Sequence, residues 1–248
     1  MNSYNTDSKG RAICPSFLDK MSCQLGHTKA FLFDMDGVLF DSMKNHAEAW
    51  VRAMKENGLT MSREDVYMNE GRTGAGTIDI FAKEQWGREA TDEEKEHIYK
   101  VKSEIFNTLP HVEQISGSAE LLQYVKTLGM QRVIVTGSGQ KSLLERLENN
   151  FPGIFTPQLM VTAFDVKHGK PHPEPYLMGL EKAGVEAKDA IVVENAPLGI
   201  NSAKAAGIFT VAINTGPLDD AILYDAGADI VFPDHECFLK TLAKMSCN

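Results

Sequence analysis

The stretch FLFDMDGVLFDS, from Phe31 to Ser42, decides the fold. Its apolar run ends abruptly in Asp34, and Asp36 follows just before Gly37. A strand this apolar is typically buried on both faces, as in a parallel sheet. Side chains repeat every second residue along an extended chain, so both carboxylates are expected to face one cavity. That cavity would lie at the carboxyl end of the strand, where open α/β sheets bind their ligands.

The two carboxylates have two possible interpretations. Like charges a few ångströms apart raise one carboxyl pKa or recruit a cation, and magnesium is the hard cation that suits oxygen ligands. One acid would then act as a nucleophile and the other as a proton carrier. The alternative is a buried strand that ends in a polar turn with no chemical role. Taken alone, the stretch does not decide between them.

The composition predicts a soluble globular protein. The chain has 248 residues, of which 43% are hydrophobic and 24% charged, enough to bury a sizeable core. No long apolar run or signal-peptide pattern occurs, so no membrane span and a cytoplasmic location are expected. A net charge of -9 without a Lys/Arg cluster argues against nucleic acid or an anionic membrane as partner. The four cysteines lie near the chain ends in no metal-ligand spacing, which predicts reduced thiols rather than a zinc site.

Alternating apolar runs and helical segments predict a doubly wound parallel sheet. After the first strand, five more are expected, at residues 132–135, 159–161, 191–193, 210–213 and 230–232. Ser118 is expected to cap a helix that stops at Gly129, and Pro197 to open another that reaches Gly207.

The chain is expected to divide into a tail, a core and an inserted cap. Residues 1–26 form a polar tail with no sustained period, docked loosely on the rest. Residues 43–112 are helical in pattern, rich in Lys and Glu and without a convincing strand, which predicts a helical cap domain. Residues 27–42 and 113–248 then form the core domain.

Further polar residues follow other predicted strands. Thr136, Gly137 and Ser138 follow one of them, where hydroxyl and backbone N–H groups can hold phosphate oxygens, although a plain glycine-rich turn would look the same. Lys170 lies in the proline-stiffened segment GKPHPEP, and Glu194 with Asn195 ends another strand. Carboxylates, a hard cation, a lysine and hydroxyl donors are what a phosphoryl group requires, so together these positions predict a phosphoryl-transfer site.

In order and spacing, these four motifs resemble those of the haloacid dehalogenase superfamily, in the subgroup similar to β-phosphoglucomutase. The resemblance covers roughly residues 29–232 and implies a Rossmann-like core with a helical cap that closes over the substrate. It implies that Asp34 is the nucleophile and forms an aspartyl phosphate, and that Asp36 is the general acid and base. Thr136 and Lys170 would bind the phosphoryl oxygens. Magnesium would be held by Asp34, the backbone carbonyl of Asp36, Glu194 and Asn195.

The cap and one metal position depart from the family pattern. Asn195 stands where the subgroup often has a second acid. His46 and Trp50 have the spacing of phosphoglucomutase-like caps, which favours a small sugar phosphate as substrate. Arg72 is expected to bind the substrate, but it is shifted by about two residues from the mutase arginine that binds a second phosphate. The loop after Thr136 reads GSGQK.

These departures favour a magnesium-dependent phosphatase that acts on a small sugar or polyol phosphate, as a monomer or weak dimer. A β-phosphoglucomutase that interconverts β-glucose 1-phosphate and glucose 6-phosphate is the alternative. A ligand-binding protein without catalysis is a third, which the intact Asp34, Asp36 and Lys170 disfavour.

Overall fold

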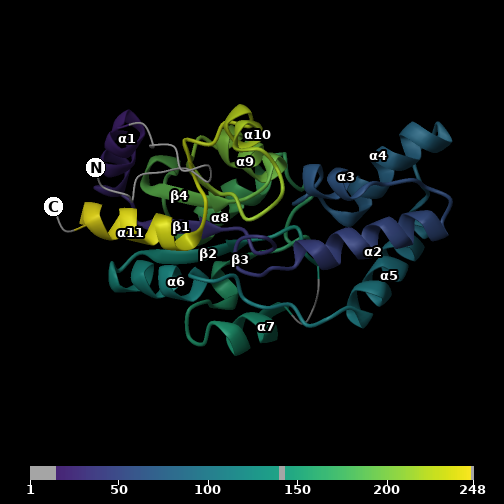
Figure 1. The fold of residues 1–248 in the computed structure, drawn as a ribbon, viewed down its shortest axis with the longest axis horizontal. Coiled ribbons are helices and arrows are strands. Elements are labelled where there is room, and N and C mark those ends of the chain that lie inside the picture. Colours follow the sequence, from purple (N-terminus) through teal and green to yellow (C-terminus); the bar gives the residue numbers. More distant parts are fainter. Residues whose placement is uncertain (1–14, 140–142, 247–248) are drawn as a thin grey trace.

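The computed structural model describes residues 15–139 and 143–246, and in these residues six parallel strands form one sheet (Figure 1). Their order across the sheet is β3-β2-β1-β4-β5-β6. The strands are β1 (Ala30–Phe33), β2 (Gln131–Val135), β3 (Met160–Val161), β4 (Ala190–Glu194), β5 (Phe209–Ile213) and β6 (Ile230–Phe232). Each expected strand is present, and the predicted doubly wound parallel fold is confirmed.

The central strand β1 is buried on both faces, as its apolar sequence predicts. Phe31 and Phe33 face one apolar cluster and Leu32 faces the other, because side chains alternate across a strand. The first cluster includes side chains from the helices α1 (Pro15–Leu25), α6 (Ser118–Thr127), α7 (Leu143–Asn150) and α11 (His235–Ser246). The opposite face is covered by α8 (Glu174–Ala183), α9 (Pro197–Ala205) and α10 (Asp220–Asp225), and short 3₁₀ turns precede β3 and β4 at Pro157–Leu159 and Ala187–Asp189.

Four helices lie together beyond one end of the sheet (Figure 1). They are α2 (Met43–Glu56), α3 (Arg63–Met68), α4 (Gly74–Trp86) and α5 (Asp92–Thr108). They share an apolar cluster of their own, in which Ala47, Trp50 and Met54 of α2 are buried. The segment 43–112 is described in full and contains no strand. Other residues of this segment pack in the core cluster, among them Ala49, Ile105 and Val112, so cap boundaries at residues 43 and 112 stay a prediction.

Two local expectations are wrong. Residues 15–25 were expected to belong to a loosely docked polar tail. They instead form helix α1, which buries Met21 and Leu25 against the sheet. The apolar side chains of α1 have helical spacing, but there are too few of them for the sequence alone to show a helical repeat. Ser118 is the first residue of α6 rather than its cap, because Gly117 occupies the cap position with a φ of 83°. The Ser118 hydroxyl instead donates to the carbonyl of Leu39, at 3.5 Å.

In the part of the chain that the structure covers, no helix has the length and apolar character needed to cross a lipid bilayer.

Candidate active site

The ends of three neighbouring strands bring the predicted core residues together. Strand β1 lies between β2 and β4, so Asp34, Thr136 and Glu194 meet at one edge of the sheet. Lys170 joins this group from the segment before α8. Its Nζ lies 2.5 Å from Asp34 Oδ1, 2.6 Å from Glu194 Oε1 and 3.0 Å from the carbonyl oxygen of Val135.

The buried lysine and carboxylates stabilise one another's charge. Burial disfavours the ammonium of Lys170, but the carboxylates of Asp34 and Glu194 outweigh burial and raise its pKa. Burial also raises the pKa of Asp34 to about 8, against the opposing effect of Lys170. A cation on the second Asp34 oxygen would favour the ionised form that nucleophilic attack requires.

Glu194 is held on all sides by the protein. Besides Lys170, it accepts a hydrogen bond from the Tyr176 hydroxyl at 2.7 Å and from the backbone N–H groups of Asn195 and Ala196 at 3.0 and 3.3 Å. Gly199 on α9 leaves the necessary space, because a Cβ there would lie 1.8 Å from Glu194 Oε1. Both Glu194 oxygens therefore have protein partners, and Asn195 is the better placed metal donor of the predicted pair.

The donor set at this edge fits magnesium. Asn195 is 7% exposed, and its Oδ1 atom has no hydrogen-bond partner among the described residues. A buried amide oxygen without a partner is costly unless a ligand satisfies it, and amide, carbonyl and carboxylate oxygens are what magnesium prefers. The described residues contain no cluster of three His, Cys, Asp or Glu side chains arranged for a metal. A magnesium site here would thus use mixed donors: the carboxylate of Asp34, the backbone carbonyl of Asp36 and the amide of Asn195.

Asp36 is held by a short chain of hydrogen bonds from the cap. Its Oδ1 accepts from the Ser42 hydroxyl at 2.6 Å and lies 3.2 Å from His46 Nε2. Lys102 Nζ lies 2.9 Å from His46 Nδ1, and because an ammonium only donates, His46 carries its ring proton on Nε2. Burial alone would raise the pKa of Asp36, but His46, Ser42 and Lys102 together hold it well below its usual range. Asp36 is therefore a carboxylate, aimed by a neutral histidine.

Sequence analysis missed Lys102, which lies on α5. It is 3% exposed, and its ammonium lies 5.5, 5.7 and 5.1 Å from the ring centroids of Trp50, Tyr99 and Phe106. Burial among these rings lowers the pKa of Lys102 to about 8, so it keeps its charge at neutral pH. The available signal was its spacing from Ile98 and Ile105, which places a lysine on the buried stripe of the helix.

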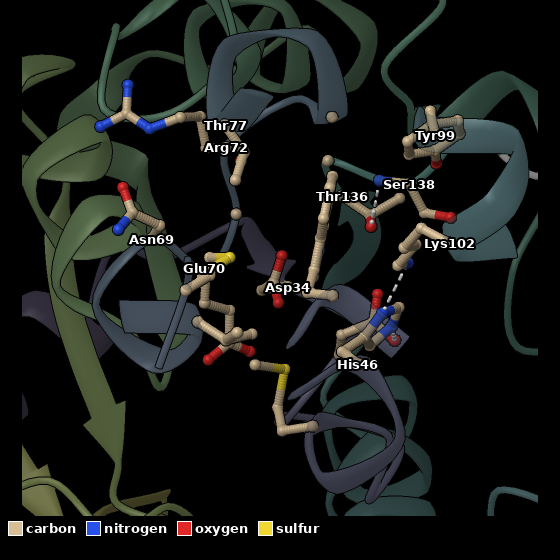
Figure 2. A pocket seen from close by; sticks show the side chains of 18 residues that line it. Asp34, His46, Asn69, Glu70, Arg72, Thr77, Tyr99, Lys102, Thr136 and Ser138 are labelled. Atoms are coloured by element: carbon tan, nitrogen blue, oxygen red, sulfur yellow. Dashed lines mark hydrogen bonds and ion pairs between the residues drawn. The ribbon is translucent and has the colours of Figure 1, made fainter. Parts of the chain in front are cut away.

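Asp34, Asp36, His46 and Lys102 line a cavity of about 70 Å³ between the core and the cap. Figure 2 shows Asp34 at its centre, with His46 and Lys102 on one side and Glu70 on the other. The phosphate-binding loop expected after β2 lines the same cavity, and the Ser138 backbone N–H donates to the Thr136 hydroxyl oxygen at 3.1 Å. A Cβ on Gly137 would lie 2.7 Å from the carbonyl oxygen of Gly71, so the cap is closed directly onto this loop.

Two polar cap residues differ in how they face the cavity. Glu70, which sequence analysis also missed, is buried, and its Oε1 accepts a hydrogen bond from Asn195 Nδ2 at 3.0 Å. Arg72 contributes to the cavity wall, but its guanidinium is directed away from Asp34 (Figure 2). Its Nε atom is buried without a hydrogen-bond partner among the described residues, and burial lowers its pKa. Gln140 and Lys141 of the predicted GSGQK loop lie outside the described residues.

The site has the groups that phosphoryl transfer requires: a buried carboxylate, a paired lysine, a hydroxyl and a second carboxylate under a cap. A family model for haloacid dehalogenase-like hydrolases matches residues 31–213. The chain belongs to this family, as its motifs predicted.

Named relatives and solved structures agree with this assignment. Hexitol phosphatase A of Escherichia coli is 31% identical over 188 residues, which cover 75% of this chain and 83% of that protein. Glycerol-1-phosphate phosphohydrolase 1 of Saccharomyces cerevisiae is 31% identical, over 84% of this chain and 82% of that protein. A solved structure from Bacteroides vulgatus, provisionally named a β-phosphoglucomutase, is 51% identical with a TM-score of 0.87, over 92% of this chain and 97% of that one.

Proposed function

We propose that this enzyme is a magnesium-dependent phosphatase that hydrolyses small sugar or polyol phosphates through an aspartyl phosphate on Asp34. The observation that carries the proposal is the pairing of buried Asp34 with Lys170, beside an Asp36 carboxylate that the cap aims through His46. This arrangement supplies a nucleophile, a charge to offset the phosphoryl oxygens, and a proton acceptor at one edge of the sheet.

The first chemical step is attack by a carboxylate oxygen of Asp34 on phosphorus. The Asp34–phosphorus bond forms as the bond from phosphorus to the sugar oxygen breaks. Lys170 and the Thr136 hydroxyl hold the phosphoryl oxygens and offset their charge in the transition state. Magnesium, when bound, would offset further negative charge on the phosphoryl group and on Asp34.

Asp36 moves the protons in both halves of the reaction. The negative charge of a bound phosphate raises the pKa of Asp36, so that it can arrive protonated and protonate the departing sugar oxygen. In the second half, the same carboxylate takes a proton from water, which attacks the aspartyl phosphate and releases free phosphate. The hydrogen bonds from Ser42 and His46 keep Asp36 in one position for both steps.

Two features support a polyol or sugar phosphate as substrate. The cavity combines polar side chains with the aromatic rings of Trp50 and Tyr99, a lining suited to a small hydroxylated molecule. The named relatives from Escherichia coli and Saccharomyces cerevisiae act on a hexitol phosphate and on glycerol 1-phosphate. We therefore propose hexitol, hexose and glycerol phosphates as the first candidates.

The cavity has few basic groups that could bind the second phosphate of a sugar bisphosphate. Of the described residues that line the cavity, the basic ones are His46, Arg72 and Lys102. Lys102 already donates to His46, and the Arg72 guanidinium is directed away from Asp34 (Figure 2). This supports the phosphatase over a β-phosphoglucomutase, the alternative favoured by the 51% identity to the Bacteroides vulgatus protein.

Arg72→Ala tests whether Arg72 binds the phosphate of the substrate. A guanidinium that gripped a phosphate would contribute a charge-assisted hydrogen bond, and its loss would cost roughly tenfold or more in KM. We expect a change in KM below about threefold for the best monophosphate substrate, because the Arg72 guanidinium is directed away from Asp34 (Figure 2). Steady-state kinetics measure this, and a tenfold rise in KM would instead assign Arg72 to substrate binding.

The proposal is tested by measuring free phosphate released from a panel of hexitol, hexose and glycerol phosphates. We expect at least one panel member to be hydrolysed with magnesium present, and the activity to disappear when a chelator removes the metal and to return when magnesium is added in excess. Hydrolysis that persists in the chelator would contradict the metal requirement. Failure to release phosphate from any member would contradict the substrate class.

A further inference from the structure

Glu70 reaches from the cap into the catalytic edge of the core. It lies in the loop between α3 and α4 and is 8% exposed. Its Oε1 atom accepts a hydrogen bond from the Asn195 amide at 3.0 Å. A Cβ placed on Gly37 would lie 2.9 Å from the same Glu70 oxygen, so Glu70 also lies against the turn that follows Asp36. A cap carboxyl group is thus packed among core residues that surround the expected magnesium position.

The surroundings of Glu70 are strongly acidic. Burial and the nearby charges of Asp34, Glu194 and Asp36 raise the pKa of Glu70, against the opposing hydrogen bond from Asn195. Lys170 lies close by but is already bonded to Asp34 and Glu194. A buried carboxyl group in such a place is costly unless a cation or a proton compensates for it.

Asn195 gives an independent sign that a cation is the missing partner. Because a carboxylate only accepts hydrogen bonds, Glu70 fixes the amide with its nitrogen toward the cap. The Asn195 Oδ1 atom is then left buried without a partner among the described residues. By holding the amide nitrogen, Glu70 leaves the side-chain oxygen of Asn195 available as a ligand for the expected magnesium ion.

We propose that Glu70 belongs to the magnesium site, where it supplies from the cap the negative charge that Asn195 does not carry. The inference rests on the proposed function in taking magnesium as the cation. Since Glu70 reaches the site only when the cap is closed over it, magnesium binding and cap closure stabilise each other. The metal then favours the closed cap, and opening the cap weakens the hold on the metal.

Calorimetric titration of the full-length protein with magnesium, without substrate, tests the binding half of the proposal. We expect Glu70→Gln, which keeps the shape and removes the charge, to raise the dissociation constant for magnesium by about tenfold. The matched control is Glu64→Gln, an exposed position on α3 of the same cap, where we expect a change below about twofold. Circular dichroism confirms that both variants fold. A Glu70→Gln protein that binds magnesium like wild type overturns the proposal.

A double variant and a shape measurement test the link to cap closure. In Glu70→Gln with Asn195→Asp the charge is returned to the core, and we expect magnesium affinity to recover. Small-angle scattering should show wild type becoming more compact when magnesium is added, whereas neither Glu70 variant responds. A wild-type shape that ignores magnesium overturns the link. A wild type that binds magnesium but hydrolyses no panel member would refute the proposed phosphatase and leave the Glu70 result intact.

Discussion

Asp34→Asn is expected to lower kcat by a factor on the order of 10⁴ or more while the fold is kept. Asparagine has the shape of aspartate, and its side-chain oxygen can still accept the hydrogen bond that Lys170 donates to Asp34. Lys170 also keeps its ion pair with Glu194, so the buried lysine does not lose its charge partner. What disappears is the anionic oxygen that attacks phosphorus.

The measurement is kcat on the best substrate of the panel, with thermal melting as the test of folding. Asp41→Asn is the matched control: it makes the same substitution in the same stretch, at an exposed side chain that pairs with Lys44 at the surface. We expect the control to retain wild-type kcat. Appreciable turnover by purified Asp34→Asn would contradict the covalent route through this residue.

Asp36→Asn is expected to lower kcat by about 10² to 10⁴, the usual contribution of a positioned general acid and base. The amide can neither protonate the sugar oxygen nor take a proton from water. With acetyl phosphate, whose leaving group needs little protonation, attack by Asp34 should continue while hydrolysis of the aspartyl phosphate is slowed. Phosphorylated enzyme should therefore accumulate.

Intact-protein mass spectrometry after acid quenching detects this phosphorylated form. The control is the double variant Asp34→Asn with Asp36→Asn, which keeps the same altered cavity but has no nucleophile and should gain no phosphoryl mass. A fully active Asp36→Asn would remove the role assigned to Asp36. Accumulation in the double variant would place the phosphoryl group on a residue other than Asp34.

The core of the site could be predicted from sequence because local patterns determine it. Each relevant strand is an apolar run that ends in a polar residue, and the topology of a parallel sheet brings such ends to one edge. Asp34, Thr136 and Glu194 meet there because β1 lies between β2 and β4. The GKPHPEP segment brings Lys170 to the same place, as its prolines predicted.

The cap side of the site could not be predicted in the same way. Lys102 and Glu70 owe their positions to the way four cap helices pack over the core, and no local pattern encodes that packing. Lys102 is a plain helical lysine until the rings of Trp50 and Phe106 surround it. Arg72 shows the converse: an arginine is a residue type that favours phosphate binding. The direction of its side chain, however, depends on how the loop between α3 and α4 turns.

The most direct test of the proposed phosphatase is phosphorus NMR of the purified protein with magnesium, β-glucose 1-phosphate and a trace of glucose 1,6-bisphosphate, run beside the panel of sugar and polyol phosphates. Each phosphorus signal reports where the phosphoryl group goes. We predict that signal from one or more panel members moves to free phosphate, with no build-up of glucose 6-phosphate. Conversion of β-glucose 1-phosphate to glucose 6-phosphate with little free phosphate would contradict the phosphatase and establish the mutase.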